Sequence, residues 1–231
     1  MKREGEQGVA LLIVLVTTGL LAALATALVL TAALEARIPA AQRDGTIAAY
    51  AAESALAAVL PDVLAAGPDA VLAGAASTFT DGGGAGGVRV LADGTGIDLD
   101  RETAQLLCGR AACTPAATTA TSPERPWGPA NPRWRVYGYG RLVDLLPAAP
   151  GAAGPDPGDG PDVYVIVWVA DDPTDADGNP LADAPAGTAG HGMLFLAARA
   201  YGRSGVRRSV RLVVERTDTG LRPIARQTTE P

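Results

Sequence analysis

Two cysteines and one histidine are the most reactive side chains in this chain of 231 residues. Cys108 and Cys113 are separated by four residues, which is close enough for a small disulfide loop. We expect this disulfide if the segment lies in an oxidising compartment outside the cytoplasm. Two free thiols are the alternative. A metal site is disfavoured, because two cysteines need further ligands and His191 is the sole histidine.

A second group of chemically capable residues is the acidic segment 171–179, which has the sequence DDPTDADGN. Oxygen-bearing side chains at alternate positions, followed by a glycine, are faintly similar to a calcium-binding loop. The bidentate glutamate that closes an EF-hand loop is missing. A solvated turn explains the same composition, and we favour it over calcium binding.

The sequence contains no residue pattern typical of an enzyme. A single histidine leaves no supported Ser-His-Asp or Cys-His arrangement. Residues 82–87 match G-x-G-x-x-G, but no predicted strand precedes them and no helix with an acidic partner follows. We therefore expect neither a nucleotide site nor catalysis, and no cofactor.

Arginines gather in the C-terminal part of a chain that is otherwise acidic. They are Arg199, Arg203, Arg207, Arg208, Arg211 and Arg216. The net charge of −6 and the pI of about 4.8 disfavour nucleic acid as a partner. We predict that these arginines alternate on the solvent face of an edge hairpin, where charge discourages pairing between sheets.

The N-terminal part of the chain contains a long apolar segment. From Val9 to Leu34 there is no charged side chain, and fourteen residues are Leu, Ile or Val. Insertion into a bilayer is favourable by about 4–8 kcal/mol for such a composition. As a helix the segment spans about 39 Å, more than the ~30 Å hydrocarbon core. We predict a membrane-spanning helix over residues 9–34.

A cleaved secretory signal is the alternative to a membrane span. Residues 25–27 (Ala-Thr-Ala) suit signal peptidase, but the apolar run continues beyond them and is too long for a signal. Lys2 and Arg3 favour an N-terminus in the cytoplasm, although Arg37 and Arg43 weaken the charge asymmetry. We expect a single-pass protein whose N-terminus lies in the cytoplasm and whose C-terminal part lies on the opposite side of the membrane.

The start of the chain resembles the class III leader of type IV pilins and pseudopilins. Residues 1–8, MKREGEQG, are polar and end in Gly8, and VALLIVLV follows directly. In that family a prepilin peptidase cuts after the glycine on the cytoplasmic side and methylates the new N-terminus. The resemblance implies cleavage between Gly8 and Val9, with Val9 methylated and the apolar segment kept on the mature protein.

A second motif is similar to the R-D…A-A-E-x-A-L pattern that follows the membrane segment in PilX-type minor pilins. It consists of Arg43, Asp44, Ala51, Ala52, Glu53, Ala55 and Leu56. The resemblance covers about residues 3–60. Most pilins carry glutamate at the fifth mature position, which is Ile13 here. PilX-type proteins and the tip pseudopilin of type II secretion often lack this glutamate, which argues against a shaft-building subunit.

The resemblance implies a minor pilin that initiates assembly of a type IV pilus or forms its tip. Its partners would be other minor pilins, the major pilin, the inner-membrane assembly platform and prepilin peptidase, and a tip adhesin is a further candidate. The protein would reside in the bacterial inner membrane with its head in the periplasm, and at the cell surface once assembled. A minor pseudopilin of type II secretion and an anchored periplasmic binding module are the alternatives.

The predicted helix continues past the membrane as an amphipathic segment over residues 35–66. Its apolar stripe is formed by Leu56, Val59, Leu60, Val63 and Leu64. Pro39 and Pro61 each remove a backbone donor, so kinks or a short break are expected there, with an anchor and a separate helix as the alternative. Gly67-Pro68 predicts the helix end.

Residues 67–231 predict a β-rich head with long Gly/Pro loops. Strands are expected over 134–143, 163–169, 193–201 and 206–216, with a hairpin turn at 202–205. Residues 88–91 are a candidate for a further short strand. Long loops are expected over 147–161 and 171–190. The predicted fold class is therefore α+β and pilin-like: about four mostly antiparallel strands packed on the second half of a long N-terminal helix.

Overall fold

The structure is a computed structural model that describes residues 4–145, 162–175 and 177–229. The predicted loop 147–161 lies outside these residues. The chain divides into two compact units, residues 1–43 and 44–231. The first helix, α1 (Glu4–Ala66), begins in the first unit and ends in the second.

The first unit contains the apolar part of α1. Residues Val9–Ala33 have a mean hydropathy of 2.5, and none of them is buried. Their large apolar side chains are 54–71% exposed. This segment is long and apolar enough to cross a membrane, and it is consistent with a single membrane anchor. Ala41–Ala66 is also apolar enough by composition, but 39% of that stretch is buried because it forms the core helix of the second unit.

The two prolines do not divide α1. Of the expected kinks or short break, the break is therefore wrong, and so is the alternative of a separate second helix. The helix is assigned continuously across Pro39 and Pro61. Both prolines are exposed, so their rings lie away from the core of the protein. Residues 35 and 57, whose carbonyls lose their usual amide partner, are exposed as well. The predicted helix end is confirmed: α1 stops at Ala66, and Gly67 follows with a positive φ of 80°.

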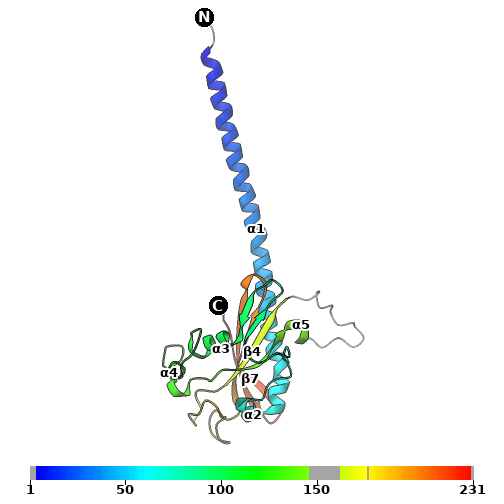
Figure 1. The fold of residues 1–231 in the computed structure, drawn as a ribbon, viewed down its shortest axis with the longest axis vertical. Helices are drawn as coiled ribbons and strands as arrows, with labels where there is room; N and C mark the ends of the chain where they lie inside the picture. Colours follow the sequence, from blue (N-terminus) through cyan, green and yellow to red (C-terminus); the bar gives the residue numbers. More distant parts are fainter. Residues whose placement is uncertain (1–3, 146–161, 176, 230–231) are drawn as a thin grey trace, which may run out of the picture. The chain divides into compact units, whose positions relative to one another are not determined.

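The second unit is built on a five-stranded antiparallel sheet whose strands are neighbours in chain order (Figure 1). They are β3 (Arg135–Arg141), β4 (Tyr164–Asp171), β5 (Met193–Tyr201), β6 (Arg207–Thr217) and β7 (Gly220–Thr229). The predicted strands match β3 to β6 within a few residues, and the hairpin turn joins β5 to β6 through a short 3₁₀ helix, η2 (Arg203–Gly205). The sequence did not predict β7, nor α5 (Leu142–Leu145) at the end of β3.

One face of the sheet packs against the second half of α1. The buried helix positions are Ala48, Ala51, Ala52, Ala55, Leu56, Val59 and Val63. They recur at helical spacing, and the alanines allow the backbone of the sheet to come close. Of the predicted stripe, Leu60 is only half-buried and Leu64 is 39% exposed. The true stripe is therefore rotated from the leucines toward the alanines.

Glycines in β3 are required by this packing. A Cβ atom at Gly138 would lie 3.2 Å from Cγ1 of Val59, and one at Gly140 would lie 2.9 Å from Cε2 of Phe79. Phe79 belongs to the segment after α2 (Pro68–Ala73), and its carbonyl accepts a hydrogen bond from the N–H of Tyr139 at 3.0 Å. The two glycines thus make room for Phe79 between β3 and α1.

The opposite face of the sheet is covered by smaller elements. The strands β1 (Val88–Val90) and β2 (Gly96–Asp98) form a two-stranded antiparallel sheet and lead into α3 (Leu99–Cys108). Their apolar residues form a second core with side chains of the large sheet, among them Ile166 and Trp168. Two short elements follow, α4 (Pro115–Thr119) and η1 (Gly128–Ala130). The α+β class is confirmed, with an N-terminal apolar helix and an antiparallel sheet.

Candidate functional sites

The predicted processing site lies in the first unit. Gly8 and Val9 are both helical residues of α1, and Val9 is 60% exposed. Ile13, at the position where most pilins have glutamate, is 55% exposed. Residues 9–33 are all exposed, and none of them is charged. Cleavage and methylation stay predictions.

The A-A-E-S-A-L segment forms the contact between α1 and the sheet. Ala51, Ala52 and Ala55 are at most 1% exposed, and Leu56 is 4% exposed. Glu53 lies outside this stripe and accepts a hydrogen bond from Arg226 of β7. Upstream, Arg43 and Asp44 fall at the boundary between the two units. Of the motif residues, Ala51, Ala52, Ala55 and Leu56 therefore pack in the core, whereas Arg43 is exposed and Asp44 and Glu53 are half-buried.

Asp62 fastens the segment after α2 to α1. Its Oδ2 accepts hydrogen bonds from the Ser77 hydroxyl at 2.6 Å, the Thr78 N–H at 2.7 Å and the Thr78 hydroxyl at 2.9 Å. Burial raises the pKa of Asp62, but these hydrogen bonds together outweigh burial and leave its pKa below the ordinary value. The ionised carboxylate is therefore the form that the fold favours.

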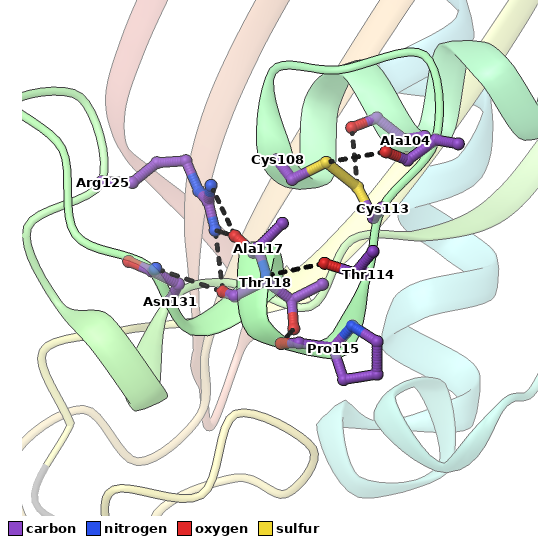
Figure 2. The surroundings of a disulfide bond; sticks show 10 residues. Ala104, Cys108, Cys113, Thr114, Pro115, Ala117, Thr118, Arg125 and Asn131 are labelled. Carbon is purple, nitrogen blue, oxygen red and sulfur yellow. Dashed lines mark hydrogen bonds between the residues drawn. A yellow bond between two sulfur atoms is a disulfide. The ribbon is translucent and has the colours of Figure 1, made fainter.

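The predicted disulfide between Cys108 and Cys113 is confirmed (Figure 2). Cys108 is the last residue of α3, and Gly109 ends that helix with a φ of 73°. The Cα atoms of the two cysteines are 6.0 Å apart. The bond fixes the end of α3 to the start of the next segment, where Thr114 caps α4 by accepting a hydrogen bond from the N–H of Ala117 at 3.2 Å.

Arg125 and Asn131 hold the segment that follows the disulfide. The Arg125 guanidinium donates to the carbonyl oxygens of Ala117 at 3.2 Å and Thr118 at 2.7 Å. The Asn131 amide donates to the carbonyl of Thr118 at 3.2 Å (Figure 2). It also donates to the carbonyl of Ala120 at 2.9 Å. Backbone carbonyls at the end of a helix lack intrahelical partners, and these two side chains supply them. The disulfide segment is thus an ordered part of the head.

Two arginines of the C-terminal group anchor α3 on the sheet. Glu102 is 7% exposed and pairs with Arg199 at 2.5 Å and Arg207 at 3.7 Å. Nearby, the indole N–H of Trp168 donates to the Thr103 hydroxyl at 2.9 Å. The prediction of an edge hairpin is wrong, because β7 pairs with β6 and covers that edge. Four of the arginines that were predicted to face solvent are exposed, namely Arg203, Arg207, Arg211 and Arg216, and Arg208 is half-buried. Arg199 differs, because its side chain is largely buried over Trp168.

A cavity of about 1050 Å³ lies between the disulfide segment and strands β5 to β7. Its aromatic lining comes from Trp127, Trp134 and Phe195, and Arg211 contributes a cationic side chain. Arg211 is exposed, but partial desolvation by the surrounding atoms lowers its pKa, and the charge of Arg199 lowers it further. The sequence did not reveal this cavity, since its lining comes from several segments that only the fold brings together.

The glycine-rich segment 82–87 precedes a short strand, β1, rather than a helix. Beside it, Oδ2 of Asp81 accepts hydrogen bonds from Arg89 Nε at 2.6 Å and from the Tyr164 hydroxyl at 2.7 Å. This network joins the loop to β4. The geometry agrees with a connector and lacks the strand–loop–helix setting of a nucleotide site.

The acidic segment 171–179 is more ordered than a solvated turn. Asp171 is the last residue of β4 and is 1% exposed, and Asp172 is 3% exposed. The carboxylate oxygens of Asp171, Asp175 and Asp177 lie within 4.8 Å of one another. The expectation of a solvated turn therefore holds only for the second part of the segment: residues 177–179 are exposed, whereas Asp171 and Asp172 are buried.

Comparison with known proteins finds no family model, curated protein or solved structure that matches the chain. The assignment of function consequently depends on the sequence motifs and on the geometry of the two units. That geometry establishes an α+β protein with an apolar, unburied N-terminal helix, a five-stranded antiparallel sheet and a disulfide.

Proposed function

We propose that this chain is a pilin-like minor subunit that initiates a type IV pilus or forms its tip. The observation that supports this most directly is that the two parts of α1 differ in burial. Val9–Ala33 is wholly unburied and apolar, whereas the same helix continues as the core helix of an antiparallel sheet. Side chains that are 54–71% exposed need an apolar environment, which a bilayer supplies before assembly and neighbouring helices supply in a filament.

Ile13 is the feature that favours a tip position. In a filament the apolar helices pack together away from water, so the charged N-terminus at Val9 needs a partner. In typical pilins the fifth-position glutamate supplies that partner to the amine of a neighbouring subunit. Ile13 has no carboxylate, so a neighbouring subunit that packs on this chain would bury its N-terminal amine without a partner. This cost does not arise at the tip of a filament, because no further subunit packs there.

Quantitative proteomics of pili sheared from the cell surface tests the proposal. We expect this chain in sheared pili at a small fraction of the major subunit, and fewer pili with an unchanged shaft when its gene is deleted. A ratio to the major subunit near one-to-one contradicts the tip position. Complete absence from sheared pili, with normal piliation in the deletion strain, contradicts a role in the pilus.

A matched pair of variants tests the role of Ile13. Ile13→Glu restores a carboxylate that can pair with a neighbouring N-terminus, whereas Ile13→Gln has nearly the same shape without the charge. We expect Ile13→Glu to raise the copy number in sheared pili relative to Ile13→Gln. Equal copy numbers for both variants would show that the missing charge does not restrict this subunit.

A membrane-anchored binding module is the second candidate, and the cavity is the observation that favours it. Its three aromatic side chains and Arg211 are suited to an apolar ligand with an anionic group. A binding module would remain in the cell envelope and would be absent from sheared pili. The proteomic experiment therefore separates the two candidates.

A further inference from the structure

Asp171 occupies a position that the rest of its strand uses for the apolar core. Alternate residues of β4, namely Val165, Val167 and Val169, belong to the core shared with α1, and Asp171 is the next residue in that row. Its partner in the β5 register is Leu194, which is fully buried. At 1% exposure a carboxylate needs hydrogen bonds or a cation to compensate for lost hydration.

Neither carboxylate oxygen of Asp171 has a hydrogen-bond partner of normal geometry. Oδ2 of Asp175 is likewise buried without a partner. Among the described residues, no arginine or histidine forms an ion pair with these carboxylates. The neighbouring Asp172 differs, because its Oδ1 accepts from the Thr174 N–H at 3.0 Å and the Thr174 hydroxyl at 2.8 Å. Among the described residues, the buried carboxylate oxygens without a partner belong to Asp171 and Asp175, both of which lie in this cluster.

The three carboxylates are arranged as the ligands of a hard cation. Asp171 is buried, Asp175 is half-buried and Asp177 is exposed, so the cluster leads from the core to solvent. Their oxygens lie within 4.8 Å of one another. Calcium binds oxygen at about 2.3–2.6 Å, so oxygens on opposite sides of one ion are about 4.6–5.2 Å apart. Magnesium, at about 2.0–2.1 Å, needs a tighter set.

The loops around the cluster fix its geometry without a cation. Gly190 has a φ of 89°, and a Cβ atom there would lie 2.5 Å from the Cβ and 2.9 Å from the Cα of Asp175. Only glycine permits this close approach of the 187–192 turn to Asp175. Asp177 is oriented by the N–H of Asn179, which donates to its Oδ1 at 2.6 Å.

Electrostatics also favour a cation at this place. Three carboxylates in this geometry repel one another unless protons or a cation neutralise them.

We propose that Asp171, Asp175 and Asp177 bind a calcium ion that joins the end of β4 to the β4–β5 loop. Backbone carbonyls of the loop and water would complete the coordination sphere, as is usual for calcium. The ion would neutralise the buried charge and order a long loop. This site is independent of the pilus proposal and stands whichever function the chain has.

Calcium titration of the full-length protein in detergent micelles, after removal of metal with EGTA, tests the site. We expect saturable binding of one ion by isothermal titration calorimetry and a rise in the melting temperature with calcium. Magnesium at the same concentration should produce a much smaller rise. No calcium-dependent change in the wild type, or an equal effect of magnesium, would overturn the proposal.

Three variants locate the binding. Asp171→Asn should weaken calcium affinity at least about tenfold and should melt no lower than the wild type in EGTA, because it removes a buried repulsion. Asp177→Asn removes the exposed ligand and should also weaken binding. Asp218→Asn, an exposed aspartate in the β6–β7 turn, is the matched control and should bind as the wild type does. If Asp171→Asn does not fold, Asp177→Asn decides: wild-type affinity in that variant overturns the site.

Discussion

Asp62 and Glu102 each hold one element of the head in place through charged hydrogen bonds. Asp62 of α1 receives three donors from Ser77 and Thr78. Glu102 of α3 receives the guanidinium of Arg199 and lies near that of Arg207. Hydrogen bonds to a charged group are stronger than neutral ones, and removing one partner leaves the other unsatisfied. Polar residues of the head thus act between elements that are distant in sequence.

Asp62→Asn should destabilise the head by about 1–2 kcal/mol at pH 7, because a neutral amide is a weaker acceptor for these donors. The pKa of Asp62 is lowered in the fold, so its contribution is complete above the ordinary value of 3.8 and is lost as the pH falls through the folded pKa. Urea unfolding followed by tryptophan fluorescence should therefore show a difference from the wild type that shrinks below pH 3.8. Asp218→Asn is the control at pH 7 and below pH 3.8. A difference that grows in acid would contradict this role.

Replacing both cysteines by serine should lower the free energy of unfolding by about 2 kcal/mol, because a closed loop restricts the unfolded chain. Protein taken from the cell envelope and denatured without reductant should show no labelling by a maleimide at Cys108 or Cys113. Reduction before labelling should expose both thiols. Two labelled thiols without reduction would show that the bond does not form in the cell.

At the scale of elements, the segment of α1 that carries the A-A-E-S-A-L motif is defined by small side chains. Four alanines of this helix, Ala48, Ala51, Ala52 and Ala55, lie against the sheet at no more than 1% exposure. Gly138 and Gly140 meet the same region from β3. Small residues on both sides allow the helix and the sheet to approach closely. A larger side chain at these positions would therefore overlap with neighbouring atoms unless the helix and the sheet moved apart.

Ala52→Leu should destabilise the head by about 1–3 kcal/mol, because the added carbons must displace the packed sheet. Ala57→Leu is the matched control: it adds the same group to the exposed side of the same helix and should change stability by less than about 0.5 kcal/mol. Melting temperatures of the two full-length variants in detergent check this. Equal melting temperatures would mean that the helix does not pack on the sheet through its alanines.

The strands were predictable where their residues were distinctive. Residues 163–169 are β-branched and aromatic, and every residue of β4 is buried. By contrast, β7 contains Pro223 and mostly exposed polar residues, which is usual for an edge strand. Its sequence therefore lacks the apolar pattern from which a strand is predicted. The helix α3 had a usable signal that was missed, since Asp98 caps it by accepting hydrogen bonds from the N–H groups of residues 100 and 101.

The candidate sites were likewise predictable only where the residues involved are close together in the sequence. The disulfide was predictable because its cysteines are close in sequence. The acidic cluster was visible in composition, but the burial of Asp171 depends on its place at the end of β4. The cavity was not predictable, since residues as distant as Trp127 and Arg226 line it. Sequence patterns report neighbours along the chain, whereas these features need contacts across the sheet.

At the scale of the whole molecule, the chain combines a folded head with an apolar segment that the head does not bury. An apolar helix near the N-terminus is common to membrane anchors, signal sequences and pilins. The three differ in one covalent feature, which is where the mature chain begins. Leader cleavage at Gly8 keeps the apolar segment, signal peptidase removes it, and a simple anchor retains residue 1.

Intact-mass and peptide mass spectrometry of the protein from cells with a functional prepilin peptidase is the most direct test of the pilin proposal. We predict a mature chain that begins at Val9 and carries one methyl group on its N-terminus. Gly8→Val should keep the leader, whereas Gly19→Val, at a position where an added Cβ meets nothing within 4 Å, should be processed normally. A chain beginning at residues 26–30, or one that keeps its leader in peptidase-competent cells, would contradict the account.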